Sequence, residues 1–387
     1  MRIVSVTPAS LDGDSRTLKE ATSFARMGHE SVVVEAVRSA RPPDDVPFSL
    51  VTLRSVGESL ADDEGAAPNV GRGAVERLAA VLGRVAGPLY FVVSFAAFNL
   101  LTARRLPAAD LYWLHGYEQF PAVWLRRRPF VYDAHDLYVA LPHDGSRLAW
   151  RDRAVHAVRE RIERACVRRA AARVTTSRSM AAAYEQRFGA AFTVVRNAQD
   201  RRVAQPSSTD VRAVTGVGDD TFLLVMVGHH KPGTVVPPAL PAGVELAFVG
   251  AGYEGTPPPG VHFVAPVPPE QVAAFIATAD AAVLLYVPVT DNSPTQLVNG
   301  LFHAVAAGLP LVHPTGMDAI RDVAEHHGLG VGADPADAAS LAAAIDTVRA
   351  RHDEFAAAVR SAQADLSWER EEAALADVLA TAGSQYR

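Results

Sequence analysis

Short apolar runs alternate with helical patterns along most of the chain, and this alternation limits the possible folds more than any other feature. Residues 3–6 are an apolar run, residues 16–27 a helical pattern that stops at Gly28, and residues 31–37 a second apolar run. A strand, a crossover helix and a second strand form one βαβ unit of a parallel sheet. Further strands are expected at 111–114, 130–132, 173–176 and 193–195, with a helix at 151–172. The first half is therefore predicted to be a doubly wound α/β domain.

A polar, irregular segment at residues 198–210 predicts a linker, and a second α/β half follows it. Strands are expected at 221–227, 244–249, 261–264, 282–286 and 309–313, with helices at 269–279 and 367–382. A chain of 387 residues is too long for one ordinary core. We predict two doubly wound Rossmann-like domains that face each other across a cleft.

Composition narrows the classes of function. Cys166 is the only cysteine, which excludes a disulfide framework and suits a reducing cytosol. Residues 1–203 carry 29 Lys and Arg against 22 Asp and Glu, whereas residues 204–387 carry 8 against 21. A basic half suits an anionic lipid or an acidic ligand, but no aromatic residues interleave its arginines, so nucleic acid is not an expected partner. The Ala, Arg and Val bias resembles the codon usage of a GC-rich genome, so the two lysines, Lys19 and Lys231, carry more weight than the arginines.

Residues 85–102 contain no charged side chain and have to be weighed as a membrane span. The run is slightly short, and Pro88 lies near its start. We expect instead a buried or interfacial helix flanked by Arg84, Arg104 and Arg105, with peripheral membrane contact as an alternative. Asp12 and Asp14 interrupt the apolar N-terminus, so a cleavable signal is not expected.

Residues 293–310 are predicted to form one helix with a cap, a polar face and a stop. Ser293 and Pro294 suit the first positions, and Gly308 suits the C-terminal end. The expected buried stripe is Leu297, Leu301 and Val305, and the expected polar face is Gln296, Asn299 and His303. This face either lines a crevice with the positive helix end near a diphosphate, or is simply solvated.

Polar residues follow two strands of the first half. His115 comes directly after the strand at 111–114, and His135 follows the strand at 130–132, between Asp133 and Asp136. Ligands of open parallel sheets bind at such strand ends, and a carboxylate beside a histidine favours the imidazolium form. The alternative for each histidine is a structural role in the core. Asp12-Gly13-Asp14 matches an Asp-x-Asp metal motif but is interpreted as a turn.

A glycine-bounded loop, Gly228 to Gly233, follows the first strand of the second half and contains His229, His230 and Lys231. A lysine in such a loop can act as a point charge on phosphate. The Walker pattern is absent, so hydrolysis of a nucleotide triphosphate is not expected.

Six blocks together resemble retaining glycosyltransferases of the two-Rossmann-domain (GT-B) kind, family 4, over nearly the whole chain. The blocks are residues 14–30, which end in Gly-His-Glu, and residues 131–137, 195–197, 248–252, 299–310 and 367–369. The resemblance implies domains at 1–198 for the acceptor and 199–365 for the nucleotide sugar, and a helix at 366–387 that returns to the first domain.

The resemblance also implies transfer of a sugar from a nucleotide diphosphate with retained anomeric configuration, and no metal or other cofactor. His135 would be catalytic, in contact with the donor sugar or the acceptor, and Lys231 would stabilise the diphosphate leaving group. The expected donor-binding residues are Gly228, His229, His230, Lys231, Gln296, Asn299, Gly300 and His303, and the expected acceptor-binding residues are Asp14, His115 and Asp136.

Two positions depart from the family pattern. His303 stands where the family usually has a glutamate, and Thr295 stands at the partner position eight residues earlier. A neutral imidazole offers one donor and one acceptor, which does not reproduce a carboxylate on two ribose hydroxyls. The segment between Lys231 and residue 244 is short and proline-rich, so the helix after the phosphate loop is expected to be missing or stunted.

Three functions remain open on these residues. The first is a cytoplasmic retaining glycosyltransferase that acts on a small molecule of natural product biosynthesis or on a cell-envelope acceptor. The second is a non-catalytic protein that binds a sugar or nucleotide, and the third is a nucleotide-sugar epimerase that uses Asp133 and Asp136 as acid and base. The nucleotide, the sugar and the oligomeric state are not predicted.

Overall fold

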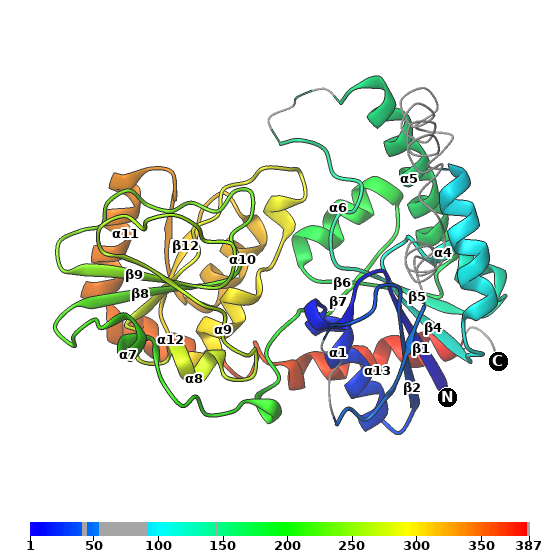
Figure 1. The fold of residues 1–387 in the computed structure, drawn as a ribbon, viewed down its shortest axis with the longest axis horizontal. Helices are drawn as coiled ribbons and strands as arrows, with labels where there is room; N and C mark the ends of the chain where they lie inside the picture. The colour runs from blue at the N-terminus through cyan, green and yellow to red at the C-terminus, as the bar shows by residue number, and fades with distance from the viewer. Residues whose placement is uncertain (41–44, 54–91, 144–145, 147, 385–387) are drawn as a thin grey trace, which may run out of the picture.

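Two α/β lobes lie side by side in the computed structural model, which describes residues 1–40, 45–53, 92–143, 146 and 148–384 (Figure 1). The first lobe has a seven-stranded sheet in the order β3-β2-β1-β4-β5-β6-β7, and the second a six-stranded sheet in the order β10-β9-β8-β11-β12-β13. Every pair of neighbouring strands in both sheets is parallel. The predicted fold class, two doubly wound domains, is confirmed.

The elements of the first lobe follow the predicted alternation, with additions that the sequence did not reveal. Its strands are β1 (Arg2–Thr7), β2 (Glu30–Glu35), β3 (Ser49–Thr52), β4 (Leu111–His115), β5 (Phe130–Ala134), β6 (Ala172–Thr175) and β7 (Thr193–Val194). Its helices are η1 (Leu11–Gly13), α1 (Ser15–Arg26), α4 (Phe120–Leu125), α5 (Trp150–Arg169) and α6 (Arg178–Phe188). Strand β3, helix α4 and helix α6 were not predicted.

The second lobe begins after a connection that contains η3 (Arg201–Val203), within the predicted linker. Its strands are β8 (Phe222–Val227), β9 (Val244–Val249), β10 (Val261–Val264), β11 (Ala281–Val283), β12 (Leu311–Pro314) and β13 (Gly330–Ala333). Its helices are α7 (Val211–Thr215), α8 (Val272–Ile276), η4 (Ser293–Thr295), α9 (Asn299–Ala307), α10 (Asp318–His327), α11 (Ala338–Ala350) and α12 (His352–Ala362). Helix α8 is shorter than predicted, and α10, α11, α12 and β13 were not predicted.

Each sheet reverses its strand order at one point, and polar loops gather there. In the first sheet β1 pairs with β2 on one side and β4 on the other, and in the second β8 lies between β9 and β11. Crossovers leave in opposite directions from such a point, so the loops separate and leave a crevice at the carboxyl ends of the strands. The candidate residues of both halves lie at these two edges.

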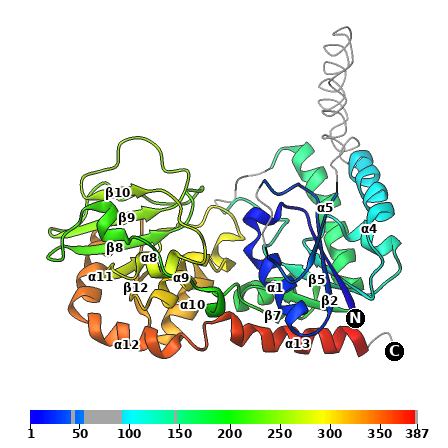
Figure 2. The same cartoon turned by 60° about the horizontal axis from the view of Figure 1, so that its bottom comes forward.

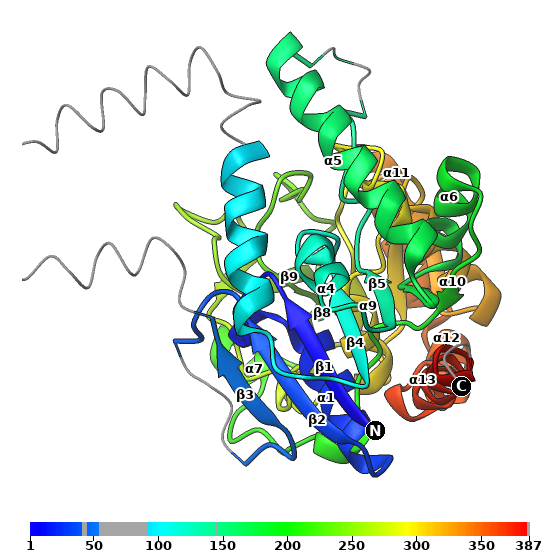
Figure 3. The same ribbon diagram turned by 90° about the vertical axis from the view of Figure 1, so that its right-hand side faces the viewer.

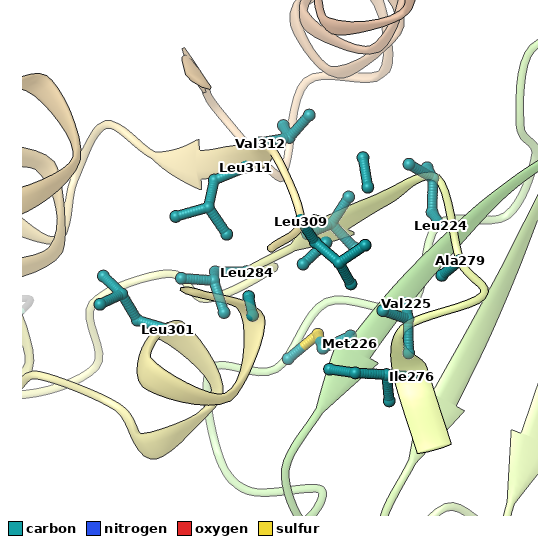
Figure 4. Close-up of a cluster of buried hydrophobic side chains, with 14 of the residues drawn as sticks. Leu224, Val225, Met226, Ile276, Ala279, Leu284, Leu301, Leu309, Leu311 and Val312 are labelled. Atoms are coloured by element: carbon teal, nitrogen blue, oxygen red, sulfur yellow. The ribbon is translucent and has the colours of Figure 1, made fainter. Parts of the chain in front are cut away.

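A single apolar core holds α8 and α9 against the second sheet. Leu224, Val225 and Met226 of β8 belong to one buried cluster with Ile276 of α8 and Leu301 of α9 (Figure 4). Apolar residues on every position of β8 are expected for a strand covered on both faces. The packing fixes the start of α9 beside the carboxyl end of β8.

The last helix, α13 (Trp368–Ser384), belongs to the first lobe in space. It leaves the second lobe and runs beneath the first, as Figure 2 shows in red. Trp368 is fully buried in a cluster with Phe24 and Trp113, and its indole Nε1 donates to Ser23 Oγ at 2.9 Å. The chain therefore crosses between the lobes twice, near residue 198 and near residue 367, and the second sheet is formed by the residues between these two crossings.

Residues 92–105 form a helix on the outside of the first lobe, in cyan in Figure 3. It turns Asn99, Thr102 and Ala103 inward and leaves Leu100 47% exposed. The run was expected to be a buried or interfacial helix: residues 92–102 are helical with one buried face and one exposed face, which excludes full burial and agrees with the interfacial alternative. Residues 85–91 and Arg84 lie outside the described part of the chain. Within the described residues, none of the helices has the length and apolarity needed to cross a membrane.

Candidate functional site

The carboxyl edge of the first sheet holds a buried ionic cluster centred on Asp133, at the end of β5. Arg16, in the first turn of α1, donates from Nε to Asp133 Oδ2 at 2.8 Å and from Nη2 to Oδ1 at 2.9 Å. Its Nη1 donates to the carbonyl of Val195 at 2.6 Å, and Glu20 completes the cluster with an ion pair at 3.0 Å. A planar guanidinium suits this two-pronged contact with a carboxylate.

Two histidines from neighbouring strands meet at this cluster. His115 Nδ1 lies 3.1 Å from His135 Nε2, and these atoms lie 3.5 and 3.2 Å from Asp133 Oδ2. The pairing of β4 with β5 places His115 opposite Asp133 and so explains the contact. The sequence predicted that both histidines follow strand ends, but not that their rings touch.

Burial and charge act in opposite directions on these groups. Burial raises the pKa of Asp133, but the charges of Arg16 and His135 outweigh it and hold that pKa well below its usual value. Burial lowers the pKa of His135, and the charge of Asp133 reverses this and raises it. Burial lowers the pKa of His115, and burial raises the pKa of Glu20 well above its usual value. The cluster therefore favours an ionised Asp133 and a protonated His135.

Asp14 lies beside the cluster as the N-cap of α1. Its Oδ1 accepts from the Thr17 amide at 3.0 Å, and its Oδ2 accepts from the hydroxyls of Thr7 at 2.8 Å and Thr17 at 2.6 Å. The Asp12-Gly13-Asp14 segment is a 3₁₀ turn followed by this cap, as the interpretation as a turn predicted.

Asp136 connects the two lobes. Its Oδ1 accepts from Gln296 Nε2 at 2.8 Å and from Asn292 Nδ2 at 2.9 Å, and the Asn292 side chain in turn accepts from the amide of Leu137 at 2.8 Å. A predicted acceptor residue and a predicted donor residue are therefore in direct contact. An antiparallel bridge between Pro142 and Thr290 extends the same interface.

The loop after β8 is held against the loop after β9. His229 Nδ1 accepts from the Ala251 amide at 2.9 Å, and the amide of His230 donates to the Ala251 carbonyl at 2.8 Å. Both imidazoles are exposed, while the ammonium of Lys231 lies 4.9 Å from the centre of the Tyr286 ring. Burial lowers the pKa of Lys231, and the charge of Asp136 opposes that shift, which places Asp136 within electrostatic range of the lysine.

Glycines let the backbones approach closely at this second edge. A Cβ on Gly250 would lie 2.0 Å from the carbonyl oxygen of Gly228, and one on Gly300 would lie 2.5 Å from that of Val227. Residues 228–243 contain no helix, so the predicted loss of the helix after the phosphate loop is confirmed. Backbone groups rather than a crossover helix shape this edge.

The segment 293–310 is not one helix, and that prediction is wrong. Residues 293–295 form η4, Gln296 and Val298 are extended, and α9 starts only at Asn299. Ser293 Oγ accepts from the amides of Val289 and Thr290 at 3.1 Å each instead of capping a helix. The break turns Gln296 toward Asp136, while Gly308 ends α9 in the left-handed conformation as predicted.

His303 faces the connection between the lobes. It is 7% exposed, and its Nε2 lies 3.3 Å from Gln199 Nε2, while its Nδ1 is buried without a hydrogen-bond partner. Burial and the charge of Lys19 lower the pKa of His303 to about 4. Asn299, one turn earlier, is exposed and accepts from Asn197 Nδ2 at 2.9 Å. The ribose role of His303 stays a prediction.

Sequence reasoning missed two residues of the site. Arg16 organises the ionic cluster, and Asn292 joins the two lobes, yet neither was singled out. Arg16 was not singled out because arginines were given little weight. The available signal was its position, two residues after the helix cap Asp14 and on the same helix face as Glu20. Asn292 lies in a loop, and a contact with the other half of the chain leaves no local signal.

Comparison with known proteins agrees with this geometry. Residues 14–198 match the family described as the glycosyl transferase 4-like domain. The chain has no match among curated protein sequences. HepE of Anabaena, solved in complex with UDP, is 17% identical with a TM-score of 0.66, and the alignment covers 98% of this chain and 100% of that one. Sucrose-phosphate synthase of Thermosynechococcus elongatus is 15% identical with a TM-score of 0.65 and 98% of each chain covered.

The trehalose 6-phosphate synthase of Burkholderia multivorans is also similar, with 14% identity, a TM-score of 0.60 and 99% of each chain covered. The fold is that of the GT-B glycosyltransferases, which confirms the fold that the resemblance implied. Residues 14–198 are thus similar to the glycosyl transferase 4-like domain, and the whole chain shares the fold of the solved GT-B glycosyltransferases.

Proposed function

We propose that this protein is a retaining glycosyltransferase that moves a sugar from a nucleotide diphosphate to a hydroxyl, amine or thiol acceptor without a metal ion. The observation that carries this proposal is the contact of Asp136 with Gln296, because it brings the acceptor edge of the first sheet against the donor edge of the second. HepE of Anabaena has been solved with UDP and with UDP and glucose, which supports a nucleotide sugar as the donor.

The roles follow from charge and position. Bond cleavage leaves negative charge on the diphosphate, and Lys231 together with the positive N-terminal end of α9 would stabilise it. His135 has 23% of its side chain exposed above the buried Asp133. It would contact the donor sugar or the acceptor at the reacting carbon.

We propose that the anomeric configuration is retained without a covalent intermediate on the protein. The environment of the two nearby carboxylates, Asp133 and Asp14, supports this. Both oxygens of Asp133 accept from Arg16, and both oxygens of Asp14 accept from threonines. The Asp133 carboxylate is fully buried, and that of Asp14 is held in place as the cap of α1, so neither is positioned to attack a sugar carbon.

The test is a screen of UDP, GDP and dTDP sugars for hydrolysis and transfer. We expect turnover that EDTA does not reduce, a product whose anomeric proton coupling matches the donor, and a loss of kcat of at least about 100-fold in His135→Asn. His156→Asn, a histidine of α5 that contacts the Val139 carbonyl, serves as the matched control. Unchanged turnover in His135→Asn would remove the catalytic assignment.

A second candidate is a non-catalytic protein that binds a nucleotide or sugar. The burial of His303 favours it, since a ring that contacts Gln199 and is 7% exposed has little surface for a ribose. Calorimetry decides between the two: no binding of UDP, GDP or dTDP supports this candidate.

We further propose that the protein is cytoplasmic and acts on a small molecule of natural product biosynthesis, with contact to anionic lipid as a secondary property. The helix at residues 92–105 supports such contact, because it exposes Val93 and Leu100 next to Arg104 and Arg105. Sedimentation with vesicles that contain anionic lipid tests it, and no binding at low salt rejects it.

A further inference from the structure

Three atoms with lone pairs converge at the end of β4 and β5, on His115, Asp133 and His135. His115 Nδ1, His135 Nε2 and Asp133 Oδ2 form a triangle with edges of 3.1, 3.2 and 3.5 Å. In tetrahedral zinc sites with bonds of about 2.0–2.1 Å, neighbouring ligand atoms lie about 3.3 Å apart. We propose that these three side chains bind one zinc-like transition-metal ion per chain, and that such an ion inhibits the protein.

The donor set selects the class of metal. Two imidazole nitrogens and one carboxylate oxygen suit Zn²⁺, Co²⁺ or Cu²⁺, whereas Mg²⁺ requires oxygen ligands in octahedral geometry. His115 and Asp133 are inaccessible, and only the partly exposed His135 opens toward solvent. The ion therefore enters past His135 and keeps one position for water, as three-ligand zinc sites do.

The surroundings support the carboxylate ligand. Arg16 holds Asp133 through both oxygens, and the indole Nε1 of Trp113 lies 3.4 Å from Oδ2. Hydrogen bonds of this kind orient ligating carboxylates in metal proteins. Asp133 therefore needs no rearrangement to present Oδ2 to an ion.

The charged side chains around the three ligand atoms also favour a divalent cation. His115 Nδ1 lies 3.9 Å from Glu20 Oε2 and 3.5 Å from Asp133 Oδ2, while Arg16 is the guanidinium bonded to both of these carboxyl groups. Lys19, on the next position of α1, turns its ammonium to the carbonyls of residues 197 and 198 instead. Carboxyl groups therefore outnumber basic side chains beside the three ligand atoms, which favours a cation there.

Binding is independent of the proposed transfer reaction, whereas inhibition rests on it. An ion on Nε2 of His135 would fix the ring in the cluster and add positive charge beside the reacting carbon, and so would disturb the contact of that ring with the sugar or the acceptor. We therefore expect Zn²⁺ to inhibit an enzyme that neither EDTA nor Mg²⁺ affects.

Titration of the intact protein with CoCl₂, in the absence of any sugar donor, tests the site. We expect one Co²⁺ per chain with the intense visible absorption of four-coordinate cobalt, displaced by one equivalent of ZnCl₂. His115→Asn should weaken binding by more than about 100-fold, since it removes a ligand itself. The controls are His229→Asn with His230→Asn, and His326→Asn with His327→Asn, which remove the other adjacent histidine pairs.

The weak absorption of six-coordinate cobalt, unchanged affinity in His115→Asn, or loss of binding in either control pair would overturn the proposal. If His115→Asn does not fold, X-ray absorption of the zinc-loaded wild-type protein decides instead. Two imidazoles and two oxygen ligands support the site, and any other set rejects it. Absence of transferase activity leaves these binding results unaffected and bears only on the proposed function.

Discussion

The two sheet edges that face each other differ in the groups that form them. At the edge of the first sheet, charged side chains are buried and bonded to one another around Asp133. At the edge of the second, glycines bring backbone segments together, and His229 and His230 remain exposed. The groups of the first edge are thus bonded to one another without a ligand. The second edge instead offers backbone groups and one lysine to a ligand.

This difference predicts that substitutions at the first edge cost stability, whereas side-chain substitutions at the second cost mainly binding. Four measurements test the contrast, and they run from the largest expected effect to the smallest.

Asp133→Asn should lower the free energy of unfolding by about 3–5 kcal/mol, because it leaves the buried guanidinium of Arg16 without its main partner. Urea denaturation monitored by fluorescence measures it. Asp318→Asn, which breaks the exposed pair between Asp318 and Arg321, should cost no more than about 1 kcal/mol. Equal effects of the two substitutions would show that the cluster is not a stabilising unit.

Gly250→Ala should cost about 3 kcal/mol, because its Cβ would meet the backbone of Gly228, which has no flexible side chain to move aside. Gly13→Ala is the control, since no atom lies within 4 Å of its Cβ position. Thermal unfolding of both variants makes the comparison. A tolerated alanine at position 250 would mean that the second edge does not depend on close backbone approach.

His303 predicts a dependence of stability on acid pH. Its pKa falls from 6.5 in the unfolded chain to about 4 in the fold, so the unfolded state binds a proton that the folded state lacks. Its contribution to stability is present above pH 6.5 and is lost as the pH falls, by about 3 kcal/mol at pH 4. His303→Gln does not titrate and should lack this loss.

Urea denaturation of wild type and His303→Gln at pH 7, 5.5 and 4 measures this difference. The exposed His326 provides the control variant, His326→Gln. A gap between wild type and His303→Gln that is constant over this range would mean that the ring is accessible to protons in the folded state, and so nearer to the cleft than Gln199 suggests.

Lys231→Ala should weaken binding of a nucleoside diphosphate about 10-fold, the effect of losing one charged hydrogen bond. The free energy of unfolding should change by no more than about 0.5 kcal/mol, since the loop is held by backbone bonds of His230 and by Gly250. Calorimetry with UDP, GDP and dTDP measures the first, with Lys231→Arg as the control that keeps the charge. A stability loss larger than the binding loss would contradict the contrast between the edges.

The predictable parts of the fold are those determined by the residue pattern within a short stretch of sequence. Apolar strands and the glycines that end helices are local signals, so the two sheets and the ends of α1 and α9 were predicted. Ser293 and Pro294 are also good helix starters, yet Ser177 Oγ donates to the Thr295 carbonyl at 2.6 Å and Asp136 binds Gln296. These contacts come from the other lobe, and they outweigh the local preference for helix.

The site was predicted in its residue types and not in its connections. His115 and His135 were expected near one edge because strand ends of a parallel sheet lie together. Their ring contact depends on the register between β4 and β5, which the sequence alone leaves open. Burial of His303 depends on where the connection near Gln199 passes, a relation between segments 104 residues apart.

The return of α13 has a consequence for the order in which the protein is made. The cluster of Ile3, Phe24 and Trp113 is covered by Trp368 and by residues up to Ala382. On the ribosome, the first lobe emerges with this apolar face bare, and it stays bare while the whole second lobe is synthesised. The first lobe is therefore complete only after α13 has been synthesised, and a chain that stalls before residue 368 presents that face to chaperones or to other chains.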